Sequence, residues 1–253
     1  MDLLFSEQSE KAMNSIHFEH LGQGIYTATN GTHTFGTDAM LLADFAAPKK
    51  KERVCDLCSG CGIIPLTFLR NNPKQSLTAV EIQKEACRLI DEGLKKSKQE
   101  EAVRIVNADL RELNEHLPCG AFDLVTINPP YFKVGSGYAC KSPEHQLIRS
   151  EVCCSVEDFA KSASRLLRSG GRLCLCHRPE RLTDVMVALR SNRLEPKRLR
   201  FVISDTDCAP WLFLMEAKAD ASGGLIIEKP FNMKNEEELK RILGEYAEKE
   251  QEA

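Results

Sequence analysis

The chain has 253 residues, of which 42% are hydrophobic and 28% charged, a balance typical of a globular protein with one or two domains. Its formal net charge of −3 excludes a general positive field for nucleic acid, so any such attraction must be local. No apolar run reaches the roughly 18 residues of a membrane span, and the N-terminus lacks the features of a signal peptide, so we expect a cytoplasmic protein without membrane contact.

Residues 1–50 are predicted to form an N-terminal extension. A weak pattern favours a strand pair around Ile16–Phe18 and Gly24–Thr27. The segment Phe35–Phe45 has apolar residues at helical spacing, and Thr37 or Asp38 can cap that helix. Three lysines at 49–51 then form a solvated linker.

Strands and helices alternate through residues 51–230. The predicted strands are Val54–Leu57, Leu77–Ile82, Val103–Val106, Ala121–Ile127, Arg172–His177, Leu199–Ile203 and Trp211–Ala217, the last two antiparallel. The helices between them are Ile63–Arg70, Lys84–Lys98, the short Leu110–His116, Ser155–Arg168, ended by Ser169-Gly-Gly, and Arg181–Ser191. This order predicts an α/β domain with a doubly wound, mostly parallel, seven-stranded sheet. Leu225–Glu228 favours one more small strand, and residues 231–253 a charged C-terminal helix or tail.

Polar residues follow four successive predicted strands. The turn Asp56-Leu-Cys-Ser-Gly-Cys-Gly62 opens a helix, and its glycines allow the backbone to approach a ligand closely. Glu81 ends the next strand, where a carboxylate can accept hydrogen bonds from ribose hydroxyls. Asp109 and Asn128 follow the third and fourth strands. Because ligands bind beyond the carboxyl ends of strands in open α/β sheets, we expect one shared site there.

The stretch Asn128-Pro-Pro-Tyr131 leaves its strand stiff and extended. Each proline fixes its own φ, and Pro129 biases Asn128 away from the helical region. The aromatic residues Tyr131 and Phe132 come directly afterwards. An ordinary strand-terminating turn would also begin with Asn-Pro, so the upstream glycine turn is what favours a functional site.

Two motifs resemble those of class I S-adenosylmethionine methyltransferases, which have a Rossmann-like fold. The glycine turn resembles their D-x-G-x-G-x-G motif, with Cys58 in place of the first glycine. Asn128-Pro-Pro-Tyr131 matches the [DNS]-P-P-[YFW] signature of enzymes that methylate planar nitrogens. The resemblance implies S-adenosylmethionine as cofactor, with Asp109 on its adenine amino group. The expected cofactor-binding residues are Thr37, Asp38, Asp56, Cys58, Ser59, Gly60, Gly62, Glu81, Ile82, Asp109, Leu110 and Asn128.

Planar nitrogens are poor nucleophiles because their lone pair is delocalised. The side-chain oxygen of Asn128 and the carbonyl of Pro129 can each accept one N–H of a target amino group, and both bonds strengthen as positive charge develops. Pro130 helps to hold these acceptors rigidly, and Tyr131 can stack on an extruded base. These four residues are the predicted catalytic group.

A narrower resemblance covers about residues 15–230. The segment from Phe35 to Asp44, the Asn128-Pro-Pro-Tyr-Phe132 context and His177-Arg-Pro-Glu-Arg-Leu182 are similar to bacterial tRNA adenine-N6 methyltransferases that modify position 37 beside the anticodon of a valine tRNA. The resemblance implies a tRNA substrate and transfer to adenine N6. Expected RNA contacts are Tyr131, Phe132, Lys133, Arg149, His177, Arg178 and Arg181. As a cluster, the basic residues between Arg165 and Arg200 could neutralise RNA phosphates.

Four alternatives stay open. A protein glutamine methyltransferase of the release-factor type, a guanine-N2 enzyme or a DNA adenine methyltransferase would use a similar signature, although each usually carries further domains. A non-catalytic cofactor-binding module is the alternative of another class.

The cysteines suggest no metal. Cys55, Cys58 and Cys61 have a spacing that iron–sulfur proteins use, but no fourth cysteine completes that pattern. With no export signal we expect reduced thiols. We also expect no metal and a monomer.

Overall fold

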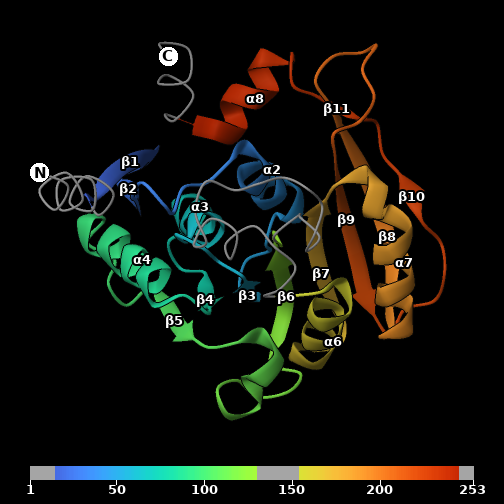
Figure 1. Cartoon of the computed structure of the whole chain (residues 1–253), viewed down its shortest axis with the longest axis horizontal. Helices are drawn as coiled ribbons and strands as arrows, with labels where there is room; N and C mark the ends of the chain where they lie inside the picture. Colours follow the sequence, from blue (N-terminus) through green and yellow to red (C-terminus); the bar gives the residue numbers. More distant parts are fainter. Residues whose placement is uncertain (1–14, 130–153, 245–253) are drawn as a thin grey trace, which may run out of the picture.

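A computed structural model describes residues 15–129 and 154–244 of the chain (Figure 1). The predicted site residues Pro130, Tyr131, Phe132, Lys133 and Arg149 lie outside the described residues. Among the helices of the described segments, none is both long and apolar enough to cross a membrane.

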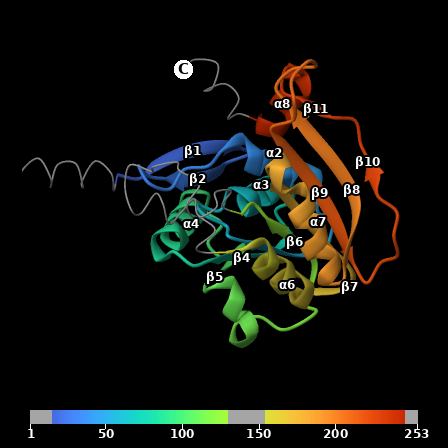
Figure 2. The ribbon, with the colours of Figure 1, turned by 45° about the vertical axis from the view of Figure 1, so that its right-hand side comes forward.

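The central sheet has the strand order β10-β8-β9-β7-β6-β3-β4-β5, and β11 also pairs with β8. Neighbours from β7 through β5 are parallel, whereas β9 runs antiparallel to both β7 and β8. The seven main strands are β3 (Arg53–Leu57), β4 (Ser76–Glu81), β5 (Val103–Asn107), β6 (Phe122–Ile127), β7 (Leu167–His177), β8 (Leu194–Ile203) and β9 (Leu212–Ala219). The predicted doubly wound, mostly parallel, seven-stranded fold is therefore confirmed. Two short parallel strands, β10 (Ile226–Ile227) and β11 (Phe231–Asn232), extend the β8 edge (Figure 2).

Alternate residues of the strands enter two separate cores, because successive side chains of a strand point to opposite faces. Val54 and Leu124 pack with α2 (Thr37–Ala46), α3 (Ile63–Asn71), α4 (Lys84–Lys96) and α8 (Glu236–Leu243) on one face. Cys55 and Val125 pack with the 3₁₀ helix η1 (Leu110–Glu115), α6 (Val156–Leu166) and α7 (Leu182–Ser191) on the other. A further 3₁₀ turn, η2 (Pro179–Arg181), precedes α7. Helices thus cover both faces of the sheet.

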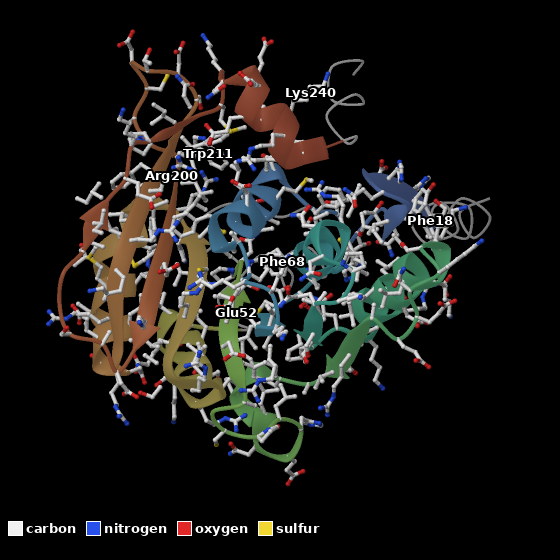
Figure 3. The ribbon with its side chains drawn as sticks, turned by 180° about the vertical axis from the view of Figure 1, so that it is seen from behind. Phe18, Glu52, Phe68, Arg200, Trp211 and Lys240 are labelled. Carbon is white, nitrogen blue, oxygen red and sulfur yellow. The ribbon has the colours of Figure 1, made fainter. Side chains whose placement is uncertain are left out.

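The N-terminal segment forms the predicted strand pair as a separate antiparallel hairpin of β1 (His17–Gly22) and β2 (Ile25–Thr29). It packs against α4, where a Cβ added to Gly93 would lie 2.9 Å from the Tyr26 carbonyl oxygen. The Tyr26 N–H donates to Ser97 Oγ at 2.8 Å. Phe68 lies in the middle of the molecule, whereas Phe18 of β1 lies at its edge, beside α4 (Figure 3). A helical glycine therefore allows the hairpin to approach α4 closely.

Two local predictions were wrong. Gly36 is the N-cap of α2 and makes no side-chain cap, so neither Thr37 nor Asp38 caps the helix. The Asp38 carboxylate instead accepts a hydrogen bond from Asn128. Residues 169–171 do not end α6, because β7 starts directly after Leu166 and carries them as an irregularity opposite β6. Gly170, with φ of 75°, supplies the left-handed backbone that this irregularity requires.

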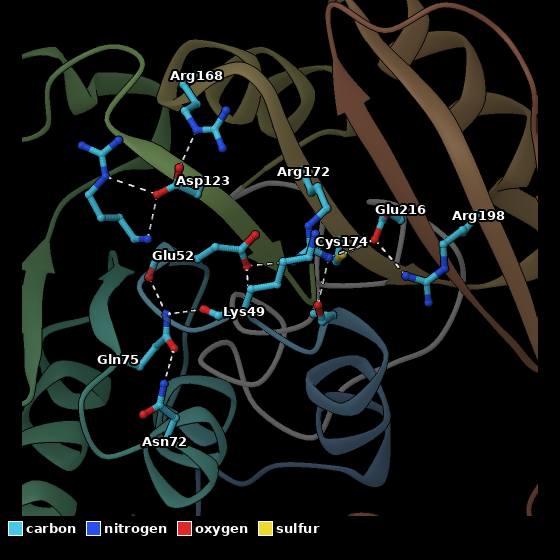
Figure 4. A network of polar contacts seen from close by, with 12 residues as sticks. Lys49, Glu52, Asn72, Gln75, Asp123, Arg168, Arg172, Cys174, Arg198 and Glu216 are labelled. Carbon is cyan, nitrogen blue, oxygen red and sulfur yellow. Dashed lines mark hydrogen bonds and ion pairs between the residues drawn. The ribbon is translucent and has the colours of Figure 1, made fainter.

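A network of polar contacts joins β7, β8 and β9 to the end of α2 (Figure 4). Arg172 donates to the Ala46 carbonyl, to Glu52 and to Glu216, at 2.9 to 3.1 Å. Glu216 also accepts from Arg198 at 2.9 Å. These charged side chains lie on the face of the sheet that α2 covers, and each has a partner of opposite sign.

The C-terminal helix α8 packs beside α2 (Figure 1). Its residues Ile242 and Leu243 are buried in the core that lies on the α2 side of the sheet. The buried Arg70 guanidinium of α3 donates to the carbonyls of Leu21, Ile242 and Leu243 at 3.0 to 3.4 Å. One side chain therefore satisfies carbonyls of both the hairpin and the last turn of α8.

Candidate functional site

A cavity of about 430 Å³ lies beyond the carboxyl ends of β3, β4, β5 and β6. Eleven predicted site residues line it: Asp38, Cys58, Ser59, Gly60, Glu81, Ile82, Asp109, Leu110, Asn128, Pro129 and Arg178. Five other described candidates, Thr37, Asp56, Gly62, His177 and Arg181, do not line it. The expected convergence at one sheet edge is thus present in the structure.

The glycine turn and Glu81 form one hydrogen-bonded unit. The carboxylate of Glu81, 6% exposed, accepts from the N–H of Gly60 and from the N–H of Gln83, each at 2.9 Å. Gly60 has φ of 54°, and a Cβ added there would meet no atom within 4 Å. Its bare backbone therefore faces open cavity. Gly62 serves packing instead, since a Cβ there would lie 2.9 Å from a side-chain carbon of Ile90.

Asp56 lies beneath this turn rather than in the cavity wall. Its carboxyl is 1% exposed and accepts from the Thr126 hydroxyl at 2.6 Å through Oδ1. Among the described residues Oδ2 has no hydrogen-bond partner. Burial raises the pKa of Asp56 from 3.8 to about 7, because taking the ionised form out of water is costly. Asp56 therefore carries a proton for part of the neutral pH range.

Cys58 keeps the backbone of the glycine that it replaces. Its φ of 55° lies in the left-handed region, which costs a non-glycine residue about 1 kcal/mol. The half-buried thiol shares a hydrogen bond with Cys154, which together with burial raises the pKa of Cys58 well above 9. The turn is therefore preserved despite the departure from the motif.

Asp109 is held at the cavity by its neighbour in the chain. It is the N-cap of η1 and accepts from the backbone N–H and the guanidinium of Arg111, with the shortest contact at 2.5 Å. This hydrogen bonding lowers the pKa of Asp109 below 3.8. Asn107 braces the same corner by donating to the carbonyls of Glu81 and Ile82 at 2.9 Å. The ionised carboxylate therefore has a fixed position.

Asn128 is held from two sides. Its Nδ2 donates to Asp38 Oδ2 at 3.1 Å, and its Oδ1 accepts from the Cys176 thiol at 3.1 Å. Asp38 comes from the first turn of α2, and Cys176 from β7. Three elements therefore meet at the amide of the predicted catalytic asparagine.

Sequence reasoning missed the segment at residues 33–35, which lines the cavity together with the glycine turn. Asn30 Oδ1 accepts from the N–H groups of Thr32 and His33, and the His33 ring donates from Nε2 to Gln83 at 2.8 Å. The dipeptide Asn30-Gly31 is a turn signal that could have indicated this loop.

The predicted RNA contacts after β7 differ in position. Arg178 lines the cavity and donates to the Trp211 carbonyl at 3.2 Å. His177 is only 1% exposed, and its Nδ1 accepts from the Arg178 N–H. Burial, with the charges of Arg181 and Arg178, lowers the pKa of His177 to about 4. His177 is therefore neutral at physiological pH and lies beneath the surface.

The basic residues between 165 and 200 do not form one cluster. Arg168 and Arg172 lie at the beginning of β7, and Arg178 and Arg181 lie beyond its end, about 20 Å away at roughly 3.3 Å per residue. Most pair with carboxylates: Arg168 with Asp123, Arg172 with Glu52 and Glu216, Arg181 with Asp184, Arg190 with Glu195, Arg193 with Asp220, Arg198 with Glu216 and Glu228, and Arg200 with Glu228. The basic residues are therefore spread along the sheet, and most of them pair with carboxylates; whether they contact RNA stays a prediction.

The described cysteines are free thiols. Cys55 and Cys61 are buried, and Cys58 is half-buried. Within residues 15–129 and 154–244, no three His, Cys, Asp or Glu side chains are grouped so that they could hold a metal ion.

Comparisons with known proteins agree on the family. Residues 29–190 match the methyltransferase small domain family. A relative from Erwinia tasmaniensis is 30% identical over 69% of this chain and 70% of its own length, and one from Parabacteroides distasonis is 27% identical over 73% and 76%. Both are named tRNA1(Val) (adenine(37)-N6)-methyltransferase.

A crystal structure of a predicted O-methyltransferase from Agrobacterium tumefaciens matches with a TM-score of 0.64 and 23% identity, covering 78% of this chain and 87% of that one. At that identity it shows the shared fold alone. The match over residues 29–190 and the relative at 30% identity show more: this chain belongs to the methyltransferase small domain family, together with relatives among the tRNA1(Val) (adenine(37)-N6)-methyltransferases.

Proposed function

We propose that the protein transfers a methyl group from S-adenosylmethionine to the exocyclic N6 of an adenine in tRNA, and specifically to adenine 37 of tRNA1(Val). The observation that carries the proposal is the position of Asn128 and Pro129 just after the carboxyl end of β6, where they line the same cavity as Glu81 and Asp109. The names of the Erwinia and Parabacteroides relatives support the choice of substrate.

The cavity has the features that S-adenosylmethionine requires. Gly60 has no side chain to project into the open cavity, so the backbone can approach the amino-acid part of the cofactor. Glu81, fixed by two backbone N–H groups, would accept hydrogen bonds from the ribose hydroxyls. Asp109 would accept from the adenine amino group. When bound, the cofactor supplies an electrophilic methyl group on a sulfonium.

The residues at the end of β6 would act on the target amino group. Asn128 Oδ1 and the Pro129 carbonyl accept its two N–H groups, and both bonds strengthen as positive charge develops on nitrogen. The methylated nitrogen carries one extra proton and a positive charge, and this proton passes to water, so no side chain is needed as a base. The buried neutral His177 is not placed to serve as one. Pro130 would stiffen the acceptors and Tyr131 would stack on the base. Catalysis on this proposal rests on placement and on fixed acceptors.

The test is methyl transfer from labelled S-adenosylmethionine to unmodified total tRNA, with a release factor as a second acceptor. Wild type, Asn128→Ala and the exposed control Asn114→Ala are compared, followed by nucleoside analysis. We expect N6-methyladenosine from wild type and Asn114→Ala, and a loss of about 100-fold in kcat for Asn128→Ala. Label on the release factor and none on tRNA would reassign the substrate to a glutamine amide. Transfer to neither acceptor would contradict the proposal.

We propose further that the protein works as a monomer in the cytoplasm. Light scattering coupled to gel filtration would give a mass close to 28.3 kDa if it is a monomer.

A further inference from the structure

The carboxylate of Asp38, in the first turn of α2, lies between Gly36 and the Asn128 side chain that follows β6. Gly36, the N-cap of α2, has φ of −114°, which any residue adopts, yet a Cβ added to it would lie 2.5 Å from Asp38 Oδ1. The absence of that Cβ therefore makes room for one carboxylate oxygen. The other, Oδ2, accepts from Asn128 Nδ2 at 3.1 Å, across 90 residues of chain.

This contact has a direction. An ionised carboxylate only accepts hydrogen bonds, whereas a side-chain amide donates from nitrogen and accepts at oxygen. The NH₂ of Asn128 must therefore face Asp38, and Oδ1 must point away from it. The Cys176 thiol donates to Oδ1 at 3.1 Å from the opposite side, and so favours the same orientation.

The direction matters for an amino-group substrate. With Oδ1 at the end of the amide away from Asp38, the side chain presents an acceptor, and not a donor, to the N–H groups of the target. Rotated by 180°, it would present its own N–H groups to those of the target, and neither group could accept. An asparagine without directional partners would divide its time between the two orientations.

We propose that Asp38 is a positioning residue that orients the Asn128 amide, so that its oxygen and not its NH₂ group meets the amino group to be methylated. Gly36 serves the same end by leaving space for the carboxylate, and Cys176 supports the orientation from β7. The inference rests on the proposed methylation of an amino nitrogen, and it assigns Asp38 a task beyond lining the cofactor cavity.

A reversal of polarity tests the inference. In Asn128→Asp two carboxylates face each other, so we expect kcat for tRNA methylation to fall about 100-fold. In the double variant Asp38→Asn with Asn128→Asp, the new amide donates to the new carboxylate, whose remaining oxygen is again an acceptor for the target. We expect the double variant to recover at least about 10-fold of the lost kcat, with an unchanged KM for tRNA.

Two further variants separate orientation from general damage. Gly36→Ala displaces the Asp38 carboxylate without removing its charge, and we expect it to lower kcat in the same direction as Asp38→Ala. Asp44→Asn removes a carboxylate from the same helix, where Asp44 pairs with the exposed Arg241, and should keep wild-type kcat. Equal activity of Asn128→Asp and wild type would overturn the inference, as would a double variant no better than Asn128→Asp.

A measurement without any substrate keeps this test apart from that of the proposed function. In a ¹⁵N-labelled sample the side-chain NH₂ signals of Asn128 are assigned by their loss in Asn128→Ala. We expect them to shift, and their exchange with water to accelerate, in Asp38→Ala and Gly36→Ala but not in Asp44→Asn. Unchanged signals in Asp38→Ala would refute the orientation. If the signals change in Asp38→Ala and Gly36→Ala while the wild-type protein methylates no acceptor, only the proposed function is refuted.

Discussion

At the scale of single residues, Asp56 and Asp109 show how position sets protonation. Both follow the pattern of acidic residues at strand ends, but Asp56 is buried beneath the glycine turn while Asp109 is paired with Arg111. Burial raises the pKa of the first, and hydrogen bonding lowers that of the second. Two like side chains therefore differ in charge near neutral pH because of their surroundings alone.

The raised pKa of Asp56 makes stability depend on pH. Between pH 4 and about 7 the folded protein holds a proton that the unfolded chain has released, so the free energy of unfolding falls as pH rises. The full effect is about 4 kcal/mol. The side chain in Asp56→Asn stays neutral at every pH. Urea unfolding at several pH values should therefore show that the free energy of unfolding of the wild type falls by about 4 kcal/mol relative to that of the variant as pH rises from 4 to above 7. Asp207→Asn, an exposed carboxylate, is the control, and parallel curves for wild type and Asp56→Asn would contradict the prediction.

At the scale of elements, Glu216 connects three strands and a helix end. It is 8% exposed and accepts from Arg172 of β7 and Arg198 of β8, and Arg172 continues to Glu52 and the last turn of α2 (Figure 4). If the charge of Glu216 is removed, Arg172 and Arg198 stay largely buried without one of their carboxylate partners. The free-energy cost of those unpaired charges exceeds the net contribution of the ion pairs to stability.

We therefore expect Glu216→Gln to lower the free energy of unfolding by about 2 kcal/mol. Glu195→Gln is the matched control, since Glu195 pairs with the exposed Arg190, and it should cost less than about 1 kcal/mol. Urea unfolding at one pH compares the two. Equal losses would mean that burial of the Glu216 network adds nothing to its stability.

At the scale of the whole molecule, Arg70 joins both ends of the described chain to α3. Its guanidinium satisfies the Leu21 carbonyl of the hairpin and the Ile242 and Leu243 carbonyls of α8. A Cβ added to Gly244, which has φ of 63°, would lie 2.8 Å from Arg70 Nη1. The glycine that follows α8 therefore permits the arginine to reach these carbonyls.

Arg70→Met keeps the length of the side chain and removes its donors. We expect a loss of about 3 kcal/mol in the free energy of unfolding, because buried carbonyls are left without partners. Hydrogen exchange should accelerate in β1 and α8 and remain slow in β3 and β6. Arg241→Met, which breaks only an exposed pair with Asp44, serves as control. Uniform acceleration across the sheet would contradict a local role.

The order of elements and the main site motifs were readable from the sequence because their signals are local. Short apolar runs predict buried strands, glycines after β3 predict a close turn, and paired prolines after β6 predict a stiff exit from that strand. Parallel strands bring their carboxyl ends to one edge, so the sequence alone is enough to place Glu81, Asp109 and Asn128 together.

Contacts between distant segments were decided only by the tertiary structure. Whether an arginine neutralises phosphate or pairs with a carboxylate depends on neighbours from other elements, so the basic residues around β7 could not be interpreted from their spacing. The burial of His177 and the orientation of Asn128 by Asp38 likewise depend on how α2, β6 and β7 pack. A sequence specifies which polar groups exist, whereas packing decides which of them meet, because a hydrogen bond requires contact within about 3 Å.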